Sequence, residues 1–186
     1  YQEYKPGRSL MEYGLVPFMQ GTEEVAWSDL VRKKAMDNDF GGGIFSVTYR
    51  NPRLNTTLGG GWNRYEGHHF GKVLWVKNYI GSLTPNHEYY RNNGAKNDMN
   101  IYLKADYNIA RGLNIYADLQ YRHITHRISG VNDNFDDVTS AMQRLDVDRH
   151  YNFFNPKLGL HYTFARAHSV YASAAVGQKE PTRNNF

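Results

Sequence analysis

Histidines are the side chains of this sequence with the widest chemical capacity, and there are eight of them. Imidazole is the commonest metal ligand in proteins, and His68 stands directly before His69. Adjacent residues do not have the spacing of a zinc site, and the chain has no Cys that could complete one. Solvated loop histidines are therefore the favoured interpretation. We predict no metal site and no cofactor.

An acidic run at 133–137 is the second candidate, because carboxylates bind calcium. The run lacks the D-x-D-x-D-G spacing and the terminal Glu of a calcium loop, so a solvated loop is again favoured. No nucleophile beside a base, phosphate-binding glycine loop or paired-carboxylate pattern is present. We therefore predict that the protein is not an enzyme. Tyr, His and Trp in the loops are candidates for ligand contact, but the sequence does not single out ligand-binding residues.

The composition limits the class of protein. Mean hydropathy is −0.70, yet 15% of the residues are aromatic. No stretch approaches the ~18 apolar residues of a membrane-spanning helix, and the aromatic content argues against disorder. The net charge of +4 is mixed along the chain, with a single basic triplet at 32–34, so we predict no nucleic-acid partner. A soluble all-β domain and a membrane β-barrel remain.

Apolar residues recur with a period of two in the segments that are predicted to form the secondary structure. Over 98–109 every second residue is apolar or amphipathic, and the pattern restarts over 113–125 after the short turn 110–112. Alternate side chains of a strand point to opposite faces, so each strand has an apolar face and a polar face. The apolar positions predicted to face lipid are Met99, Ile101, Leu103, Ala105, Tyr107, Ile109, Leu113, Ile115, Ala117, Leu119, Leu158, Leu160, Tyr162, Val170, Ala172, Ala174 and Val176. The polar positions predicted to face a lumen are Lys104, Asp106, Asp118, Gln120, Arg122, Lys157 and His161.

The predicted fold is all-β, an antiparallel up-and-down meander of about six or more strands that forms part of a large transmembrane β-barrel. Residues 1–39 read as an extracellular-loop-like region with room for short strands, and residues 40–186 as hairpins of the barrel wall. The strands are expected at about 40–50, 56–65, 98–109, 113–125, 153–164 and 169–177. Short turns at 51–55, 110–112 and 165–168 alternate with long loops at 66–97 and 126–150. Outer-membrane barrels sort short turns and long loops to opposite ends in this way.

Several stretches then resemble the TonB-dependent receptors of Gram-negative outer membranes. They are residues 37–41, 58–71, 104–108, 112–122, 155–162, 170–171 and 180–185. Their order and spacing carry the resemblance more than any single motif does.

The resemblance implies a barrel of about 22 strands that imports a scarce nutrient, such as an iron chelate, a cobalamin or a glycan. It also implies several partners: the rest of the barrel and a plug domain, TonB through an N-terminal part, outer-membrane lipid and a small nutrient ligand. No plug-like or TonB-contacting stretch is found here, so we expect a fragment of the later barrel. An isolated fragment is expected to self-associate through its open edges.

Two alternatives remain beside the transporter. One is a soluble all-β binding module of carbohydrate-binding or adhesin type. The other is a small autonomous outer-membrane barrel.

Overall fold

The structure is a computed structural model that describes residues 1–81, 83–84, 87–164 and 168–181. The predicted turn residues 165–167 and the family-like stretch 182–185 lie outside the described residues.

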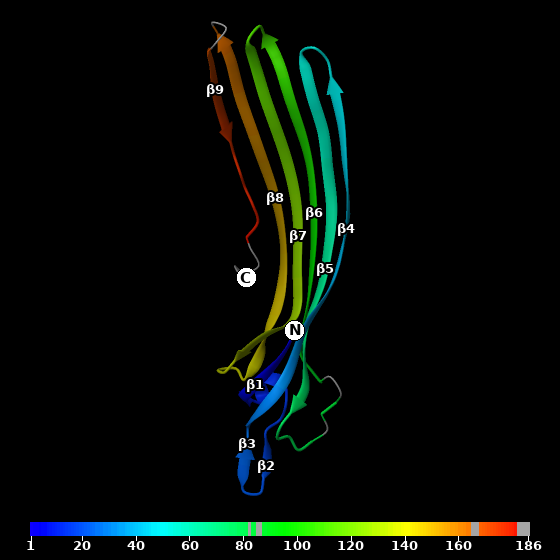
Figure 1. Ribbon diagram of the computed structural model, residues 1–186, viewed down its shortest axis with the longest axis vertical. Helices are drawn as coiled ribbons and strands as arrows, with labels where there is room; N and C mark the ends of the chain where they lie inside the picture. The colour runs from blue at the N-terminus through cyan, green and yellow to red at the C-terminus, as the bar shows by residue number, and fades with distance from the viewer. Residues whose placement is uncertain (82, 85–86, 165–167, 182–186) are drawn as a thin grey trace. The chain divides into compact units, whose positions relative to one another are not determined.

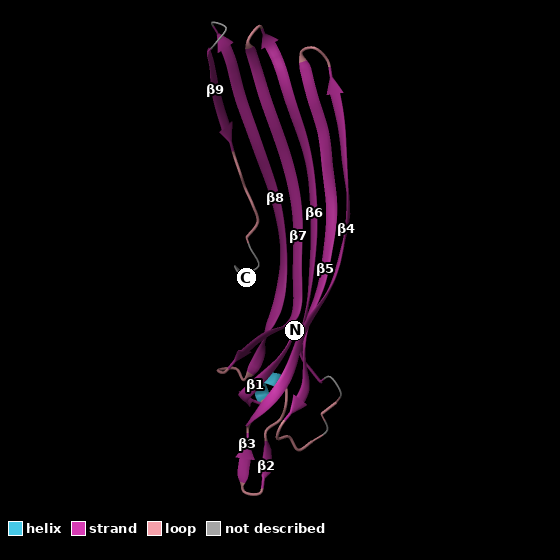
Figure 2. Ribbon diagram, in the orientation of Figure 1, coloured by secondary structure: helices cyan, strands magenta, loops and turns pink. Residues whose placement is uncertain are grey.

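The described chain is almost entirely β-structure (Figure 2). Its strands are β1 (Gln2–Ser9), β2 (Phe18–Gln20), β3 (Glu23–Val25), β4 (Trp27–Arg50), β5 (Leu54–Val76), β6 (His87–Ala110), β7 (Leu113–Asp136), β8 (Ala141–Phe164) and β9 (His168–Ala175). One short 3₁₀ helix, η1 (Met11–Tyr13), follows β1. No helix among the described residues combines the length and apolarity needed to cross a membrane.

The main sheet has seven strands in the order β1-β4-β5-β6-β7-β8-β9, and β2 and β3 form a separate hairpin. From β4 onward, strands adjacent in the chain are adjacent in the sheet (Figure 1). This arrangement confirms the predicted all-β meander. Strands β1 and β9 lie at its two edges, so the sheet does not close within the described residues.

The chain divides into two compact units. Unit 1 contains residues 1–39, 65–95 and 127–148, and unit 2 contains residues 40–64, 96–126 and 149–186. Strands β4 to β8 contribute residues to both. The hairpin turns at 51–53 and 111–112 belong to unit 2, and the connections 77–86 and 137–140 belong to unit 1.

The strands are longer than the sequence pattern indicated. Residues 66–97 and 126–150, expected as loops, are largely strand, because β5 runs to Val76, β6 starts at His87, β7 runs to Asp136 and β8 starts at Ala141. Strand β4 starts at Trp27 and not near residue 40. A backbone ladder needs no apolar face, so the period-two signal ends where both faces are polar while the strand continues.

The segment 1–39, expected as a loop-like region with room for short strands, contains β1, β2, β3 and the start of β4, and β1 pairs with β4 in antiparallel register from Gln2↔Lys33 to Ser9↔Trp27. It supplies much of the core of unit 1, whose buried members are Leu10, Tyr13, Leu15, Leu30, Val73, Tyr89 and Tyr90. The rings of Tyr13 and Tyr89 lie 4.8 Å apart at a tilt of 55°. Aromatic pairs in such geometry add to the free energy of burial. The N-terminal segment is thus a structural part of unit 1.

Candidate functional site

A bulge in β1 sets the direction of Arg8. The pairing of β1 with β4 shifts between Lys5 and Arg8, and Gly7 has a φ of +53°. The Gly7 N–H donates to Asp29 Oδ1 at 2.9 Å, and the Tyr4 hydroxyl donates to Asp29 Oδ2 at 2.8 Å. Bulges re-aim the side chains beside them. Asp29 therefore anchors the backbone that presents Arg8.

Tyr13, the last residue of η1, follows this bulge in the chain and is held by three contacts. Its ring packs on Tyr89, its carbonyl oxygen lies 2.9 Å from His87 Nε2, and its hydroxyl accepts from Arg32 Nη1 at 3.5 Å. Gly14 follows η1 with a φ of +66°, which ends the helix in the left-handed region that favours glycine. The Tyr13 ring is thus buried while its hydroxyl is held beside Arg32.

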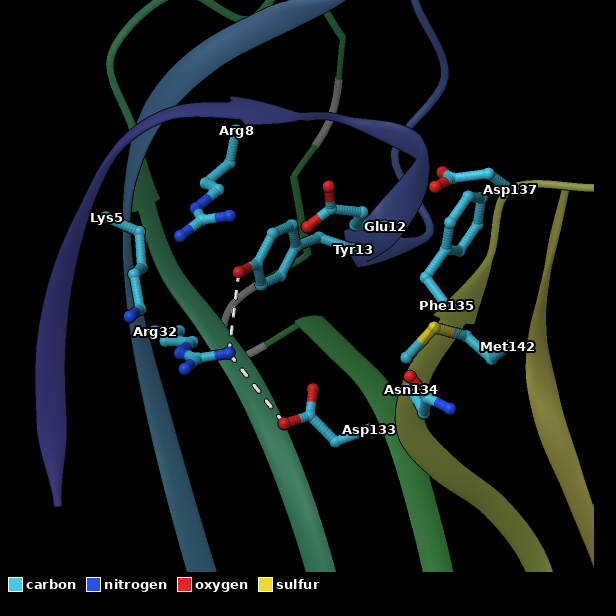
Figure 3. A pocket seen from close by; sticks show the side chains of 10 residues that line it. All are labelled: Lys5, Arg8, Glu12, Tyr13, Arg32, Asp133, Asn134, Phe135, Asp137 and Met142. Atoms are coloured by element: carbon cyan, nitrogen blue, oxygen red, sulfur yellow. Dashed lines mark hydrogen bonds and ion pairs between the residues drawn. The ribbon is translucent and has the colours of Figure 1, made fainter.

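The basic triplet and the acidic run, remote in sequence, meet in unit 1. Asp133, near the end of β7, forms an ion pair with Lys34. It forms a second one with Arg32 at 3.8 Å, which is drawn in Figure 3. Arg32 also donates to Glu3 Oε2 through Nη2 at 3.0 Å. Charges that look like two solvated patches in the sequence therefore neutralise one another.

A cleft of about 350 Å³ opens between these groups. Its volume is near the lower end of the range for small-molecule sites. Figure 3 shows Arg8, Tyr13 and Glu12 on one side of it, with Phe135, Asp137 and Met142 on the other. The residues that line it are Lys5, Arg8, Glu12, Tyr13, Arg32, Asp133, Asn134, Phe135, Asp137 and Met142.

The protonation states at the cleft follow from these contacts. Hydrogen bonds from Lys5 and Arg32 lower the pKa of Glu3. Burial raises the pKa of Tyr13 against the opposing charge of Arg32. Burial and the neighbouring charge of Arg32 lower the pKa of Lys34. The Gly7 N–H and the Tyr4 hydroxyl lower the pKa of Asp29. Glu3 and Asp29, the two carboxylates that hold β1 beside the cleft, are therefore ionised at neutral pH.

Unit 2 carries a polar face on which charges pair between strands. Lys104 Nζ lies 4.0 Å from Asp118 Oδ2, and Asp118 also accepts from the Tyr116 hydroxyl at 3.0 Å. Arg122 donates from Nε to Asp98 Oδ1 at 2.9 Å. Lys157 Nζ stands 5.7 Å from the centre of the Tyr116 ring. Three of the predicted lumen-facing residues, Lys104, Asp118 and Lys157, are thus linked through Tyr116, and a fourth, Arg122, pairs separately with Asp98.

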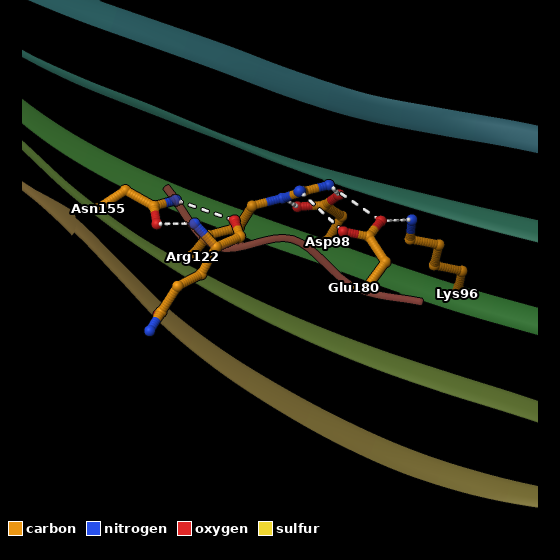
Figure 4. Close-up of polar contacts among 6 residues, drawn as sticks. Lys96, Asp98, Arg122, Asn155 and Glu180 are labelled. Carbon is orange, nitrogen blue, oxygen red and sulfur yellow. Dashed lines mark hydrogen bonds and ion pairs between the residues drawn. The ribbon is translucent and has the colours of Figure 1, made fainter. Parts of the chain in front are cut away.

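The chain after β9 lies against this polar face. Glu180 Oε1 is 2.6 Å from Lys96 Nζ, and Glu180 Oε2 is 3.0 Å from Arg122 Nη1 (Figure 4). These contacts join residues 84 and 58 positions apart in the sequence. We call residues 176–181 the strap, because Glu180 holds them to both β6 and β7.

Asn155 holds the beginning of the strap. Its Nδ2 donates to the Gln178 carbonyl at 3.3 Å, and its Oδ1 accepts from the Gln178 N–H at 2.7 Å. The Val176 N–H still donates to the Pro156 carbonyl at 2.9 Å. Backbone pairing between the strap and β8 therefore gives way to side-chain pairing at this point.

The opposite face of unit 2 is apolar and accessible. Met99 and Ile101 are each 47% exposed, and Leu158 is 55% exposed. In the antiparallel register of β8 with β9, Leu158 lies opposite Ala174 and Leu160 lies opposite Ala172. None of the 17 positions predicted to face lipid is buried in the structure. Exposed apolar surface of this extent marks an interaction with a membrane or another protein.

Sequence reasoning missed the cleft and the strap. The Pro6-Gly7 pair was a readable signal for a turn or bulge next to Arg8. No signal connected Glu180 with Lys96, because long-range ion pairs leave no local pattern. His68 Nδ1 lies 2.6 Å from Asn93 Oδ1, and no group of metal-ligating residues occurs in the described chain.

A segment of a β-barrel wall is an antiparallel sheet with one apolar and one polar face, as in unit 2. Residues 8–186 match the family described as TonB dependent receptor-like, beta-barrel. The chain belongs to this family, which consists of outer-membrane receptors and transporters, and it forms a segment of the barrel. No curated protein and no solved structure shows significant similarity to the chain.

Proposed function

We propose that this chain forms part of the wall of a transporter in a Gram-negative outer membrane, which imports a scarce nutrient and has no enzymatic role. The imported nutrient is an iron chelate, a cobalamin or a glycan. The single observation that carries the proposal is the two-sided sheet of unit 2. The family assignment supplies the class of transporter.

The apolar face supports contact with lipid. Residues 99–109 hold six apolar or amphipathic side chains on one face, and eleven residues match the ~9–11 that a tilted strand needs to cross a bilayer. Leaving such a face in water forgoes about 25 cal/mol for each Å² that could be buried. A hydrocarbon environment removes that cost.

The polar face supports contact with a water-filled or plugged lumen. Lys or Arg at the middle of a lipid face costs about 2–4 kcal/mol in a barrel, so Lys104 and Arg122 favour the inner side. Their pairing with Asp118 and Asp98 reduces the net charge of that side. The partners that follow from this role are the rest of the barrel, a plug domain and TonB, which would supply energy through another part of the receptor.

Adjacent single-cysteine variants of the complete receptor test this orientation. Leu103→Cys and Lys104→Cys differ by one position and therefore by face, and this segment has no native Cys. In lipid vesicles, a spin label at 103 should be accessible to oxygen dissolved in lipid, and a label at 104 to a water-soluble nickel complex. Equal accessibility of the two labels to both reagents would contradict the proposal.

A further inference from the structure

The lining of the cleft in unit 1 is balanced in charge. Lys5, Arg8 and Arg32 provide three cations, and Glu12, Asp133 and Asp137 provide three carboxylates. Such a site has no net attraction for a strongly charged ligand. Its selectivity must come from the groups that remain available for hydrogen bonds.

Internal pairing occupies some of these charges. Glu3 binds Lys5 and Arg32, and Asp133 binds Arg32 and Lys34. The side chains of Arg8, Glu12 and Asp137 have no hydrogen bond or ion pair within the described part of the chain; Arg8 and Asp137 are exposed and Glu12 is half-buried. One donor group and two acceptor groups therefore face the cleft without a protein partner.

Apolar surface lies beside these polar groups. The half-buried ring of Phe135 and the thioether of Met142 line the same cleft as the Tyr13 ring (Figure 3). A ring face together with donors and acceptors suits a ligand that has an apolar side and a hydroxylated edge.

We infer that this cleft binds a neutral, polyhydroxylated part of the imported ligand, such as one or two sugar rings. A hydroxyl both donates and accepts, so it can bind Glu12 or Asp137 and also Arg8. Hydrogen bonds to charged groups are the stronger kind. Among the described residues of the cleft, an anionic iron chelate would instead meet two carboxylates, Glu12 and Asp137, and one cation, Arg8, that have no protein partner. This inference rests on the proposed transport function and narrows its substrate class.

The inference is tested with the complete receptor in detergent and an array of neutral and acidic oligosaccharides as the probe. We expect binding to neutral members, weakened about tenfold or more by Arg8→Gln or Asp137→Asn, because each change removes the charge from one hydrogen bond to the ligand. Phe135→Leu keeps an apolar side chain but removes the ring, and it should also weaken binding. Arg111→Gln and Glu24→Gln change exposed residues outside the cleft and serve as matched controls.

Binding confined to acidic members, an absence of binding to neutral members, or unchanged affinity in the cleft variants would each overturn the inference. A second assay separates it from the transport proposal. If cells take up ferric citrate through the receptor in a TonB-dependent manner, and the cleft variants leave that uptake unchanged while no neutral glycan binds, the transport role stands and the sugar assignment fails. If a glycan binds in a manner that depends on the cleft, but cells show no TonB-dependent uptake of that glycan or of ferric citrate, the result would support the cleft as a binding site and contradict the transport role.

Discussion

Glu180 lies between Lys96 and Arg122, with its two carboxylate oxygens 2.6 Å and 3.0 Å from the respective nitrogen atoms. Arg122 in turn binds Asp98, which is only 7% exposed. A carboxylate from the strap therefore completes a four-residue network on the polar face of unit 2. Satisfied polar networks of this kind are stabilising, and partly satisfied ones are costly.

Glu180→Gln should loosen the strap. The change keeps the shape of the side chain but removes its charge, and two half-exposed ion pairs lose about 1 kcal/mol after allowance for solvent screening. A spin label at the exposed position 179 in the complete receptor should show an increased mobile fraction, by roughly fivefold. The matched control is Glu24→Gln, an acid that lies outside the network. Unchanged mobility in Glu180→Gln would show that the ion pairs do not hold the strap.

The strap should also respond to acid. Burial opposes ionisation of Glu180, but the hydrogen bond from Lys96 and the charges of Lys96 and Arg122 outweigh it and lower its pKa. A group with a lowered folded-state pKa stabilises above its unfolded pKa of about 4.3, and this stabilisation is lost as pH falls through the folded value. Label mobility at 179 should therefore rise only as the pH is taken below about 4. The Glu180→Gln variant should lack this rise, and a rise that begins near neutral pH would point to another group.

Gly7→Ala should disturb the cleft through the backbone. A non-glycine residue at a φ of +53° costs roughly 1–2 kcal/mol, and the strain falls on the bulge that presents Arg8. Gly21 has a φ of +67° and does not line the cleft, so Gly21→Ala imposes the same strain elsewhere. Oligosaccharide affinity should fall in the first variant and be retained in the second. Equal affinities in the two variants would show that the backbone conformation of the bulge does not affect ligand binding in the cleft.

Gly42→Ala and Gly43→Ala should differ in their effect on the sheet. A Cβ at Gly42 would meet the Trp62 carbonyl oxygen and the Asn63 backbone on β5, whereas a Cβ at Gly43 would have no neighbour within 4 Å. We expect Gly42→Ala to destabilise unit 2 by about 1–3 kcal/mol and Gly43→Ala to stay within about 0.5 kcal/mol. The midpoint temperature of the heat-induced gel shift of the receptor measures this. Equal midpoints would mean that β4 and β5 do not approach so closely at Gly42.

The sequence predicted the fold class, and it predicted the strands correctly in the parts of the chain where one face of each strand is apolar. Strand β6 ends at Ala110 and β7 starts at Leu113, which is within one residue of the expected boundaries. The same strands extend by more than ten residues beyond their predicted far ends. Polar cross-strand pairs such as Arg127 with Asp148 occupy those extensions, and a sequence pattern cannot separate them from a polar loop.

The candidate sites were less predictable. The alternation of apolar and polar residues predicted that Lys104 and Asp118 lie on the same face of the sheet. This prediction requires only that two strands adjacent in the sequence pair with each other. The cleft needs β1, β4 and β7 to come together, and the meeting of Lys34 with Asp133 depends on the order of the whole sheet. That order is a tertiary property, and local spacing does not contain it.

Beyond the end of β9, the side chain of Asn155 pairs with the backbone of Gln178. A primary amide carries the same donor and acceptor as a peptide group, so at residue 155 a side chain reproduces one rung of the ladder. Asp at this position could accept from the Gln178 N–H but could not donate to its carbonyl, and Gln would set the amide one methylene farther out. Just beyond the end of β9, the polypeptide is therefore held to the neighbouring strand by a side chain and no longer by its backbone.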